Sequence, residues 1–261
     1  MKMTICYFTA SGNCLYVARR IGGRLLSIPK LMRQEVIEIA DDMVGIVCPV
    51  YAVEMPMMVR EFLARAKIKT EYFFLIYTYG MGYAEAFAHV WLAAADAGLE
   101  LSYINAVQMV DNYLPIFKMQ EQIDTLPKKD VEGQIERIRA DVAARRTTTV
   151  AVTERTRRRM AEYRKNLGEP ILRKDTALEY IVDDRCVRCG VCAKVCPADN
   201  IAVSDKVVFS GHCEVCYACL HNCPRNAIHL RREASPVRFR NEHVSLDDII
   251  EANGKEIENE R

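Results

Sequence analysis

The chain has 261 residues and a formal net charge of +1 at pH 7, and 50% of its residues are hydrophobic. The even charge balance gives no reason to expect a nucleic-acid partner, and the composition suits one or two domains with a sizeable core. No run of about 18 apolar residues is present, so the sequence predicts no transmembrane helix.

The N-terminus is an apolar run too short for a signal peptide, and a Ser-Gly-Asn turn follows at once, so it predicts a first strand. With no targeting segment, the expected compartment is the reducing cytoplasm. The chain has 11 cysteines, most of them in one repeat. In that compartment we expect metal ligands and not disulfides.

Strands and helices alternate in the first half of the chain. Apolar runs of strand length occupy residues 3–8, 44–48, 72–78 and 101–107, with a weaker run at 36–39. Helical spacing covers residues 14–26, a stretch opened by Pro56, and residues 84–97. This alternation predicts a doubly wound α/β domain with a parallel sheet. Such sheets bind ligands at the carboxyl ends of their strands, so the loops at 9–14, 49–55 and 78–83 should meet at one edge.

The first of these loops has the chemistry of a phosphate cradle. Thr9, Ser11 and Asn13 offer side-chain donors, Gly12 lets the backbone come close, and the next helix aims its first amides at an anion. An ordinary turn between strand and helix is the alternative. The loop resembles that of flavodoxin, T-x-[ST]-G-N-[ST], which holds the phosphate of FMN. Cys14 stands where flavodoxins usually carry a hydroxyl.

Two later loops extend this resemblance. Residues 49–51 (Pro-Val-Tyr) and 78–82 (Thr-Tyr-Gly-Met-Gly) are similar to the flavodoxin loops that flank the isoalloxazine ring. Tyr51 and Tyr79 are therefore candidates to stack on a flavin, with packing at the domain edge as an equal alternative. The resemblance implies these cofactor-binding residues: Thr9, Ser11, Gly12, Asn13, Cys14, Tyr51, Thr78, Tyr79, Gly80 and Gly82.

Further along, residues 111–113 (Asp-Asn-Tyr) follow the last predicted strand. They are expected either to lie near the same ligand-binding edge of the sheet or to form a capped turn ahead of the next helix. Residues 127–166 have helical spacing and are strongly basic around 145–146 and 155–159. This basic stretch is either a patch that docks an acidic redox partner or a membrane surface, or it is simply a solvated helix face. A break at 167–170 reads as a linker.

The pattern C-x2-C-x2-C-x3-C-P occurs twice, at residues 186–197 and 213–224. In this pattern three cysteines bind one Fe4S4 cube and the fourth binds the other. The predicted metal ligands are therefore Cys186, Cys189, Cys192 and Cys223 for one cluster, and Cys213, Cys216, Cys219 and Cys196 for the other. Zinc sites usually present two C-x2-4-C pairs, and disulfides suit secreted chains, so neither alternative fits the spacing.

Smaller features complete the second half. Residues 201–203 and 207–209 predict a hairpin, residues 227–230 a last strand, and Ser245 an N-cap for a helix at 246–252. Cys6 and Cys48 fall in strands and are expected in the core. A redox-active Cys14 with a lowered pKa is a further hypothesis. His212 and His221 either tune cluster potentials or lie on the surface.

The second half resembles two-cluster bacterial ferredoxins over about residues 180–232, and the whole chain is similar to the flavodoxin–ferredoxin fusion family. That resemblance implies a flavodoxin-like FMN domain at 1–168, a ferredoxin domain with two [4Fe-4S] clusters at 169–232, and a charged tail at 233–261.

Electron transfer between the clusters and FMN, with a redox protein as donor or acceptor, is the function that these cofactors imply. No acid–base or nucleophile constellation stands out, so enzymatic activity stays open, with an oxidoreductase as the compatible class. One alternative is a reductase of flavin or a small acceptor. It would be fed by a ferredoxin-like donor, because no G-x-G-x-x-G nicotinamide fingerprint is visible. A non-catalytic iron–sulfur module that senses oxygen or holds a partner is the other.

Overall fold

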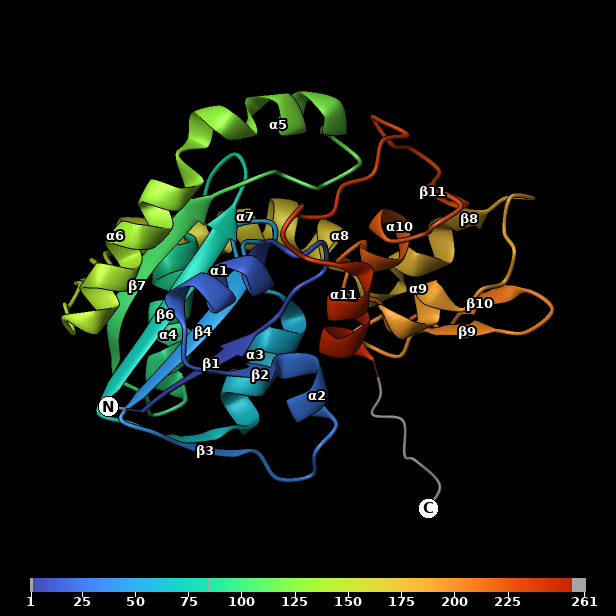
Figure 1. Cartoon of the computed structure of the whole chain (residues 1–261). Coiled ribbons are helices and arrows are strands. Elements are labelled where there is room, and N and C mark those ends of the chain that lie inside the picture. Colours follow the sequence, from blue (N-terminus) through green and yellow to red (C-terminus); the bar gives the residue numbers. More distant parts are fainter. Residues whose placement is uncertain (1, 84, 255–261) are drawn as a thin grey trace, which may run out of the picture.

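The computed structural model describes residues 2–83 and 85–254. At its centre is a parallel sheet of five strands in the order β2-β1-β4-β6-β7 (Figure 1). The strands span Met3–Tyr7 (β1), Arg24–Ser27 (β2), Met43–Pro49 (β4), Tyr72–Tyr79 (β6) and Leu101–Gln108 (β7). Counted along the chain within this sheet, the order is 2-1-3-4-5, which is the flavodoxin-like doubly wound order.

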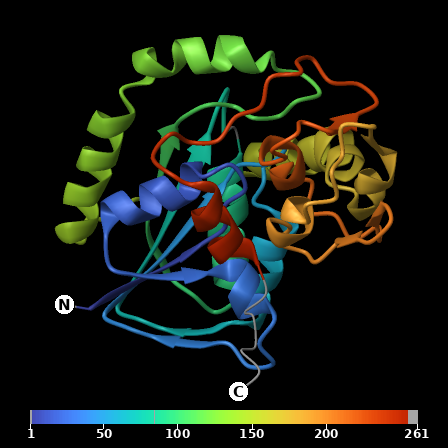
Figure 2. The same ribbon diagram turned by 45° about the vertical axis from the view of Figure 1, so that its right-hand side comes forward.

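The sheet is buried on both faces because helices cover both. On one face, α1 (Asn13–Ile21) packs with α6 (Val131–Ala143), and on the other α3 (Met57–Arg65) packs with α4 (Ala86–Asp96) (Figures 1 and 2). Strands β4 and β6 are accordingly apolar along almost their whole length. Gly45 in β4 lies under the ring of Phe74, where a Cβ would come within 2.2 Å of that ring.

Two local predictions were wrong in their bounds. The helix expected over residues 14–26 ends at Ile21, because Gly22 and Gly23 adopt φ of 95° and 94°, and the edge strand β2 follows. The weak strand expected at 36–39 is β3 (Glu38–Ala40). It pairs with β5 (Lys67–Lys69) outside the main sheet.

The charged stretch at 127–166 is not one helix. It contains η1 (Leu126–Lys129), α6 and α7 (Glu154–Tyr163), which a wider turn, η2 (Arg164–Gly168), continues. Residues 144–153 form no helix, and Arg145 has φ of 50°. Ahead of this stretch lies α5 (Met119–Thr125). Behind it, α8 (Glu169–Ile171) and η3 (Lys174–Glu179) lie in the connection to the second half.

The second half is a small α+β unit. The expected hairpin is present as β9 (Ile201–Val203) and β10 (Val207–Phe209), and the expected last strand, β11 (Ile228–Leu230), pairs antiparallel with β8 (Tyr180–Val182). The two cysteine runs each contain a short helix, α9 (Val191–Lys194) and α10 (Ala218–His221). In the described part of the chain, no helix has the length and apolar character needed to cross a bilayer.

The tail returns to join the two halves. Its helix α11 (Leu246–Asn253) begins at Ser245, whose side chain accepts from the Asp248 N–H at 3.1 Å, as the sequence predicts. It lies between α2 (Ile28–Met32) and α9, in the seam that Figures 1 and 2 show between sheet and cysteine-rich unit. Glu214 crosses the same seam, since its carboxylate accepts from the Met58 N–H at 2.9 Å in the first turn of α3.

Three consecutive carbonyl groups of the loop after β1 are hydrogen-bonded by asparagines from the second half and the tail. Asn253 Nδ2 donates to the Thr9 carbonyl at 3.0 Å and to the Val195 carbonyl at 3.1 Å. The Ala10 carbonyl accepts from Asn222 Nδ2 at 3.1 Å, and the Ser11 carbonyl accepts from the backbone N–H of Asn241 at 2.8 Å. The conformation of this loop therefore depends on residues more than 200 positions away.

Replacing Asn253 by Ala tests this dependence. Asn253 is fully buried, so the change leaves two buried carbonyls unpaired, and we expect it to lower the free energy of unfolding by about 1–3 kcal/mol. Urea unfolding followed by circular dichroism measures the effect. The matched control is Asn166→Ala, an exposed asparagine, which should leave the midpoint unchanged. Equal midpoints for the two variants would contradict the assignment.

Candidate functional site

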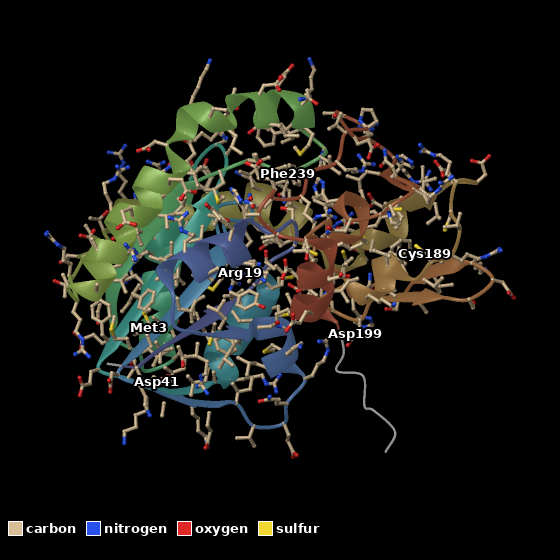
Figure 3. The ribbon with its side chains drawn as sticks, viewed as in Figure 1. Met3, Arg19, Asp41, Cys189, Asp199 and Phe239 are labelled. Atoms are coloured by element: carbon tan, nitrogen blue, oxygen red, sulfur yellow. The ribbon has the colours of Figure 1, made fainter. Side chains whose placement is uncertain are left out.

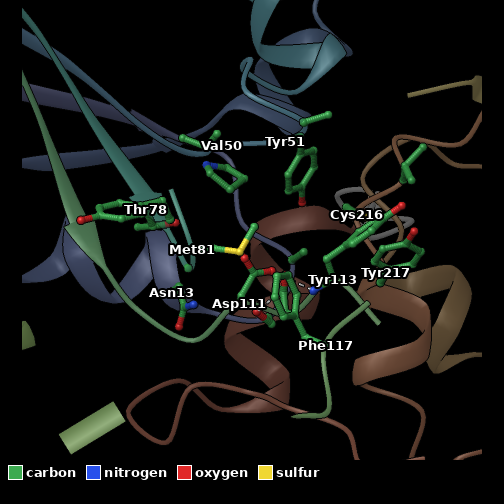
Figure 4. A pocket seen from close by; sticks show the side chains of 18 of the residues that line it. Asn13, Val50, Tyr51, Thr78, Met81, Asp111, Tyr113, Phe117, Cys216 and Tyr217 are labelled. Carbon is green, nitrogen blue, oxygen red and sulfur yellow. Dashed lines mark hydrogen bonds between the residues drawn. The ribbon is translucent and has the colours of Figure 1, made fainter. Parts of the chain in front are cut away.

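A cavity of about 290 Å³ lies at the carboxyl edge of the sheet, where the loops after β1, β4, β6 and β7 meet. We call it the edge cavity. Figure 4 shows side chains from these loops facing Cys216 and Tyr217 of the second cysteine run across it. All of the predicted cofactor-binding residues except Gly12 line it: Thr9, Ser11, Asn13, Cys14, Tyr51, Thr78, Tyr79, Gly80 and Gly82. The three predicted loops therefore do converge at one place.

Gly12 serves the loop in another way. It precedes α1 with φ of 100°, and a Cβ on it would lie 2.9 Å from the Cβ of Val244 in the tail. Glycine is required there both for the left-handed backbone and for the close approach of the tail.

One end of the edge cavity suits an anion. The Thr9 hydroxyl is buried and has no hydrogen-bond partner among the described residues. In a trans peptide the C=O and N–H point in opposite directions, so N–H groups of this loop face away from the asparagines that bind its carbonyls. The first amides of α1 also lack partners within the helix. An orphaned hydroxyl and free amides at a helix start fit a phosphate group.

Other polar side chains of this loop are already engaged. Ser11 Oγ accepts from Asn112 Nδ2 at 2.6 Å. Asn13 donates from Nδ2 to the Val110 carbonyl at 3.2 Å, and its Oδ1 accepts from Asn241 at 3.1 Å. These bonds fix the loop against the segment after β7 and against the tail. The Thr9 hydroxyl has no partner among the described residues, and the Ser11 hydroxyl, which accepts from Asn112, can still donate its own proton to a ligand.

Cys14 lies at the same end but is not an activated thiol. Its Sγ is 3.2 Å from Thr78 Oγ1, and burial raises the pKa of the thiol to about 12. The hypothesis of a lowered pKa is therefore wrong, because desolvation outweighs the helix start. Cys6 and Cys48 are buried in the core, as expected.

The other end of the edge cavity is aromatic. Tyr51 meets Phe8 edge to face with ring centroids 6.3 Å apart, and Tyr113 lies 5.8 Å from Tyr217. Burial raises the pKa of Tyr51 well above its ordinary value, so it stays a neutral phenol. Tyr217 was missed by sequence reasoning, although an aromatic residue between two cysteines of a cluster run is a signal that could have been followed.

Asp111 puts a carboxyl group on the wall of the edge cavity. Its Oδ1 accepts from the Tyr113 N–H at 3.2 Å, and burial raises its pKa, while Lys129 opposes that shift. A Cβ on Gly80 would come within 2.0 Å of the Asp111 Cβ, so only glycine lets these two loops approach.

The eight cysteines of the repeat gather in two sets around two small cavities. One cavity is lined by Cys186, Cys189, Cys192 and Cys223, and we call this set the outer cluster site. The other is lined by Cys196, Cys213, Cys216 and Cys219, and we call it the inner cluster site. The structure thus brings together the same two crossed sets that the spacing predicts.

Each of the two cysteine sets has four members, which is the number that binds a [4Fe-4S] cube. Within residues 2–83 and 85–254, no group of three or more His, Cys, Asp or Glu side chains is gathered as one metal ion would require. A cube bound by four cysteines spreads them over four irons, so it takes ligands that stand farther apart.

Donors to the cysteine sulfurs repeat in both runs. The Asn200 N–H lies 3.4 Å from Cys196 Sγ, and the Ala227 N–H lies 3.3 Å from Cys223 Sγ, four residues on in each case. At the inner site the Tyr180 hydroxyl is also 3.6 Å from Cys213 Sγ. Such donors stabilise negative charge on cluster ligands and tune their potential.

The two cluster sites differ in exposure. All four cysteines of the inner site are buried, and Cys216 also lines the edge cavity. At the outer site Cys189 is exposed, and Cys186 and Cys223 are partly exposed. Figure 3 shows Cys189 on the side of the second half that faces away from the sheet.

His221 is buried, so the surface interpretation was wrong for it, whereas His212 is exposed. His221 Nδ1 accepts from the Phe239 N–H at 3.2 Å, so the ring proton is on Nε2. This Nε2 donates to the Asn112 carbonyl at 3.0 Å. Burial lowers the pKa of His221 to about 4 and keeps the ring neutral. His221 therefore joins α10 to the loop that carries Asp111.

Comparison with known proteins identifies the second half. Residues 178–224 match the family model described as a 4Fe-4S dicluster domain. The chain matches none of the curated proteins with which it was compared. Together, the dicluster segment and the flavodoxin-like sheet give the chain the architecture of a flavodoxin–ferredoxin fusion.

Several solved structures are similar to part of the chain. A protein from Bacteroides uniformis ATCC 8492 described as a flavoprotein is 13% identical, with 41% of this chain and 90% of that chain covered and a TM-score of 0.33. A flavodoxin from the domain Archaea is 14% identical, with 52% and 99% covered and a TM-score of 0.29. Rubredoxin oxygen:oxidoreductase from Desulfovibrio gigas is 11% identical, with 54% and 37% covered and a TM-score of 0.31. These likenesses are weak, and the fold assignment rests on the strand order.

Iron content in double variants tests the crossed pairing. Cys213→Ala and Cys196→Ala should each remove one cluster, leaving about four of eight irons, and the double variant should also keep about four. Combining Cys196→Ala with Cys186→Ala should leave almost none. If the pairing followed the chain instead, these two double variants would exchange their iron contents, as measured on anaerobically purified protein.

Proposed function

We propose that this protein is an electron-transfer iron–sulfur flavoprotein that relays electrons between two [4Fe-4S] clusters and FMN held in the edge cavity. The observation that carries the proposal is the position of Cys216, which lines both the inner cluster site and the edge cavity. Because this cysteine lines both sites, an electron would pass between them over a short path.

FMN would supply a carrier that exchanges one or two electrons. The chain's own residues bind and shield it. Thr9 and the amides of its loop would hold the phosphate, while Tyr51, Tyr113 and Tyr217 would enclose the ring and exclude water. The volume of the edge cavity, about 290 Å³, lies just below the usual range for ligand pockets, about 300–1,000 Å³.

The exposure of Cys189 supports the outer cluster site as the point of exchange with an external redox protein. Arg188 and Arg225 line the outer cluster site, and they would favour an acidic partner. The division of the chain at 1–168, 169–232 and 233–261 is part of the same proposal, with the tail binding both other parts.

Counting iron, sulfide and acid-released flavin on one anaerobic sample tests this function. We expect about eight irons and about one FMN per chain. A protein with its clusters intact that neither contains flavin nor binds added FMN would overturn the relay.

Thr9→Val should weaken FMN binding selectively. The change removes the buried hydroxyl that has no partner in the chain, and the loss of one hydrogen bond to a charged phosphate should lower the affinity about 10- to 100-fold. Titration of flavin-free protein, followed by flavin fluorescence, measures this.

Riboflavin, which lacks the phosphate, is the internal control, and its affinity should not change in Thr9→Val. Thr149→Val, at an exposed threonine, is the matched variant that should bind FMN normally. An equal loss for riboflavin and FMN would place Thr9 away from the phosphate.

The carboxyl group of Asp111 favours a second candidate, a reductase of flavin or a small acceptor fed by a ferredoxin-like donor. Two-electron reduction of an organic acceptor consumes protons, and a buried carboxyl with a raised pKa beside the edge cavity can hold one. Asp111→Asn should then slow acceptor reduction about 100-fold while iron and flavin contents stay unchanged. Turnover no faster than that of free FMN would rule this candidate out.

A further inference from the structure

A second, larger cavity lies behind the loop that follows β4. Its volume is about 630 Å³, and its walls come from α3, α4 and α7. We call it the α3–α4–α7 cavity. The same loop serves both cavities, because Tyr51 to Val53 line the edge cavity and Met55 lines this one. None of the predicted cofactor-binding residues or cysteines belongs to it.

Positive charge is in excess around this cavity. Arg60, Arg157 and Arg164 line it, and Arg60 and Arg164 share one buried carboxylate, that of Glu54. Arg164 binds it with both prongs, Nε at 2.9 Å from Oε1 and Nη2 at 3.2 Å from Oε2. Arg157 has no ion pair with any described residue, and Asp96 is the remaining acid on the wall. The site therefore has guanidinium donors to spare.

A buried ring nitrogen without a partner faces the same space. His89 is 7% exposed, and its Nε2 makes no hydrogen bond with any described residue. The nearest carboxylate oxygen, Oε1 of Glu54, is 3.7 Å away, which is too long for a hydrogen bond. Burial, with help from Arg164 and Arg60, lowers the pKa of His89 to about 4, so the ring is neutral. A buried polar atom of this kind needs a partner from a ligand or solvent.

The rest of the wall is apolar. Met55, Leu63, Leu92 and Met160 contribute to it, together with several alanines. The helix α7 covers this space although none of its own residues is buried, and Arg159 ties it to Glu85 at 2.7 Å. A helix placed over an apolar space with no buried side chain of its own leaves room for something else to fill that space.

We propose that the α3–α4–α7 cavity binds a small amphipathic monocarboxylate, that is, an organic acid of about eight carbons in all, with one carboxylate and an apolar tail. Guanidinium groups match a carboxylate in charge and in fork geometry, so Arg157 and Arg60 would hold the head. His89 Nε2 would donate to the same head, and the methionine and leucine side chains would take the tail. The volume lies inside the usual range for ligand pockets, about 300–1,000 Å³.

Calorimetric titration of the anaerobically purified holoprotein with octanoate tests the site. We expect saturable binding of one octanoate per chain. Octanol, which has the tail without the charge, and inorganic phosphate, which has charge without the tail, should each bind at least tenfold more weakly. If octanol binds with the same affinity as octanoate, the cavity is an apolar groove. If phosphate binds with the same affinity as octanoate, the cavity is a general anion site. Either result overturns the proposal.

Arg157→Gln should weaken octanoate binding at least tenfold. Arg158→Gln is the matched control, since Arg158 is the next residue on α7, is highly exposed and pairs with Glu154 instead. Both changes are on the surface of one helix, so neither should affect folding. Equal affinity in the two variants would overturn the site. This binding is read directly, so it is independent of whether FMN occupies the edge cavity.

Discussion

The pairing of buried backbone carbonyls after β1 is the constraint on which the site depends. A loop that turns its amides toward an anion must turn its carbonyls somewhere else, and buried carbonyls need donors. Asn222, Asn241 and Asn253 supply them from outside the sheet domain. The conformation of the first loop is therefore not a property of that loop alone, because the second half and the tail hold it in shape.

The same seam explains why the two cluster sites are unequal. The inner site packs against the carboxyl edge of the sheet. There Glu214 accepts a hydrogen bond from the first turn of α3, and His221 donates one to the loop after β7. The outer site lies beyond this contact and keeps Cys189 exposed. A symmetric sequence repeat has thus become an asymmetric pair, because only one of its two halves is covered by another part of the chain.

Features that depend on residue spacing within a short stretch of sequence could be predicted, whereas features that depend on contacts between distant residues could not. Cysteine spacing fixes which thiolates can share a cube, and the carboxyl-edge rule brought the loops of Thr9, Tyr51 and Thr78 together. The edge strand β2 was not predicted, because Gly22 and Gly23 stand inside an apolar run that has helical spacing. Only their positive φ angles show that the helix ends before them. Asparagines carry no periodic signal, so Asn222 and Asn253 could not be distinguished from surface residues.

The tie between the first loop and the tail has a consequence for biosynthesis. A ribosome releases Thr9 early and Asn253 near the end of the described chain, so the sheet can form long before its phosphate loop is fully paired. During that interval the nascent domain has the strands of a flavodoxin-like fold, but the carbonyl groups of its first loop have no donors yet. Completion of this loop is thereby delayed until the cysteine-rich unit and the tail have both been translated, so a single late folding event joins the first loop, the cysteine-rich unit and the tail.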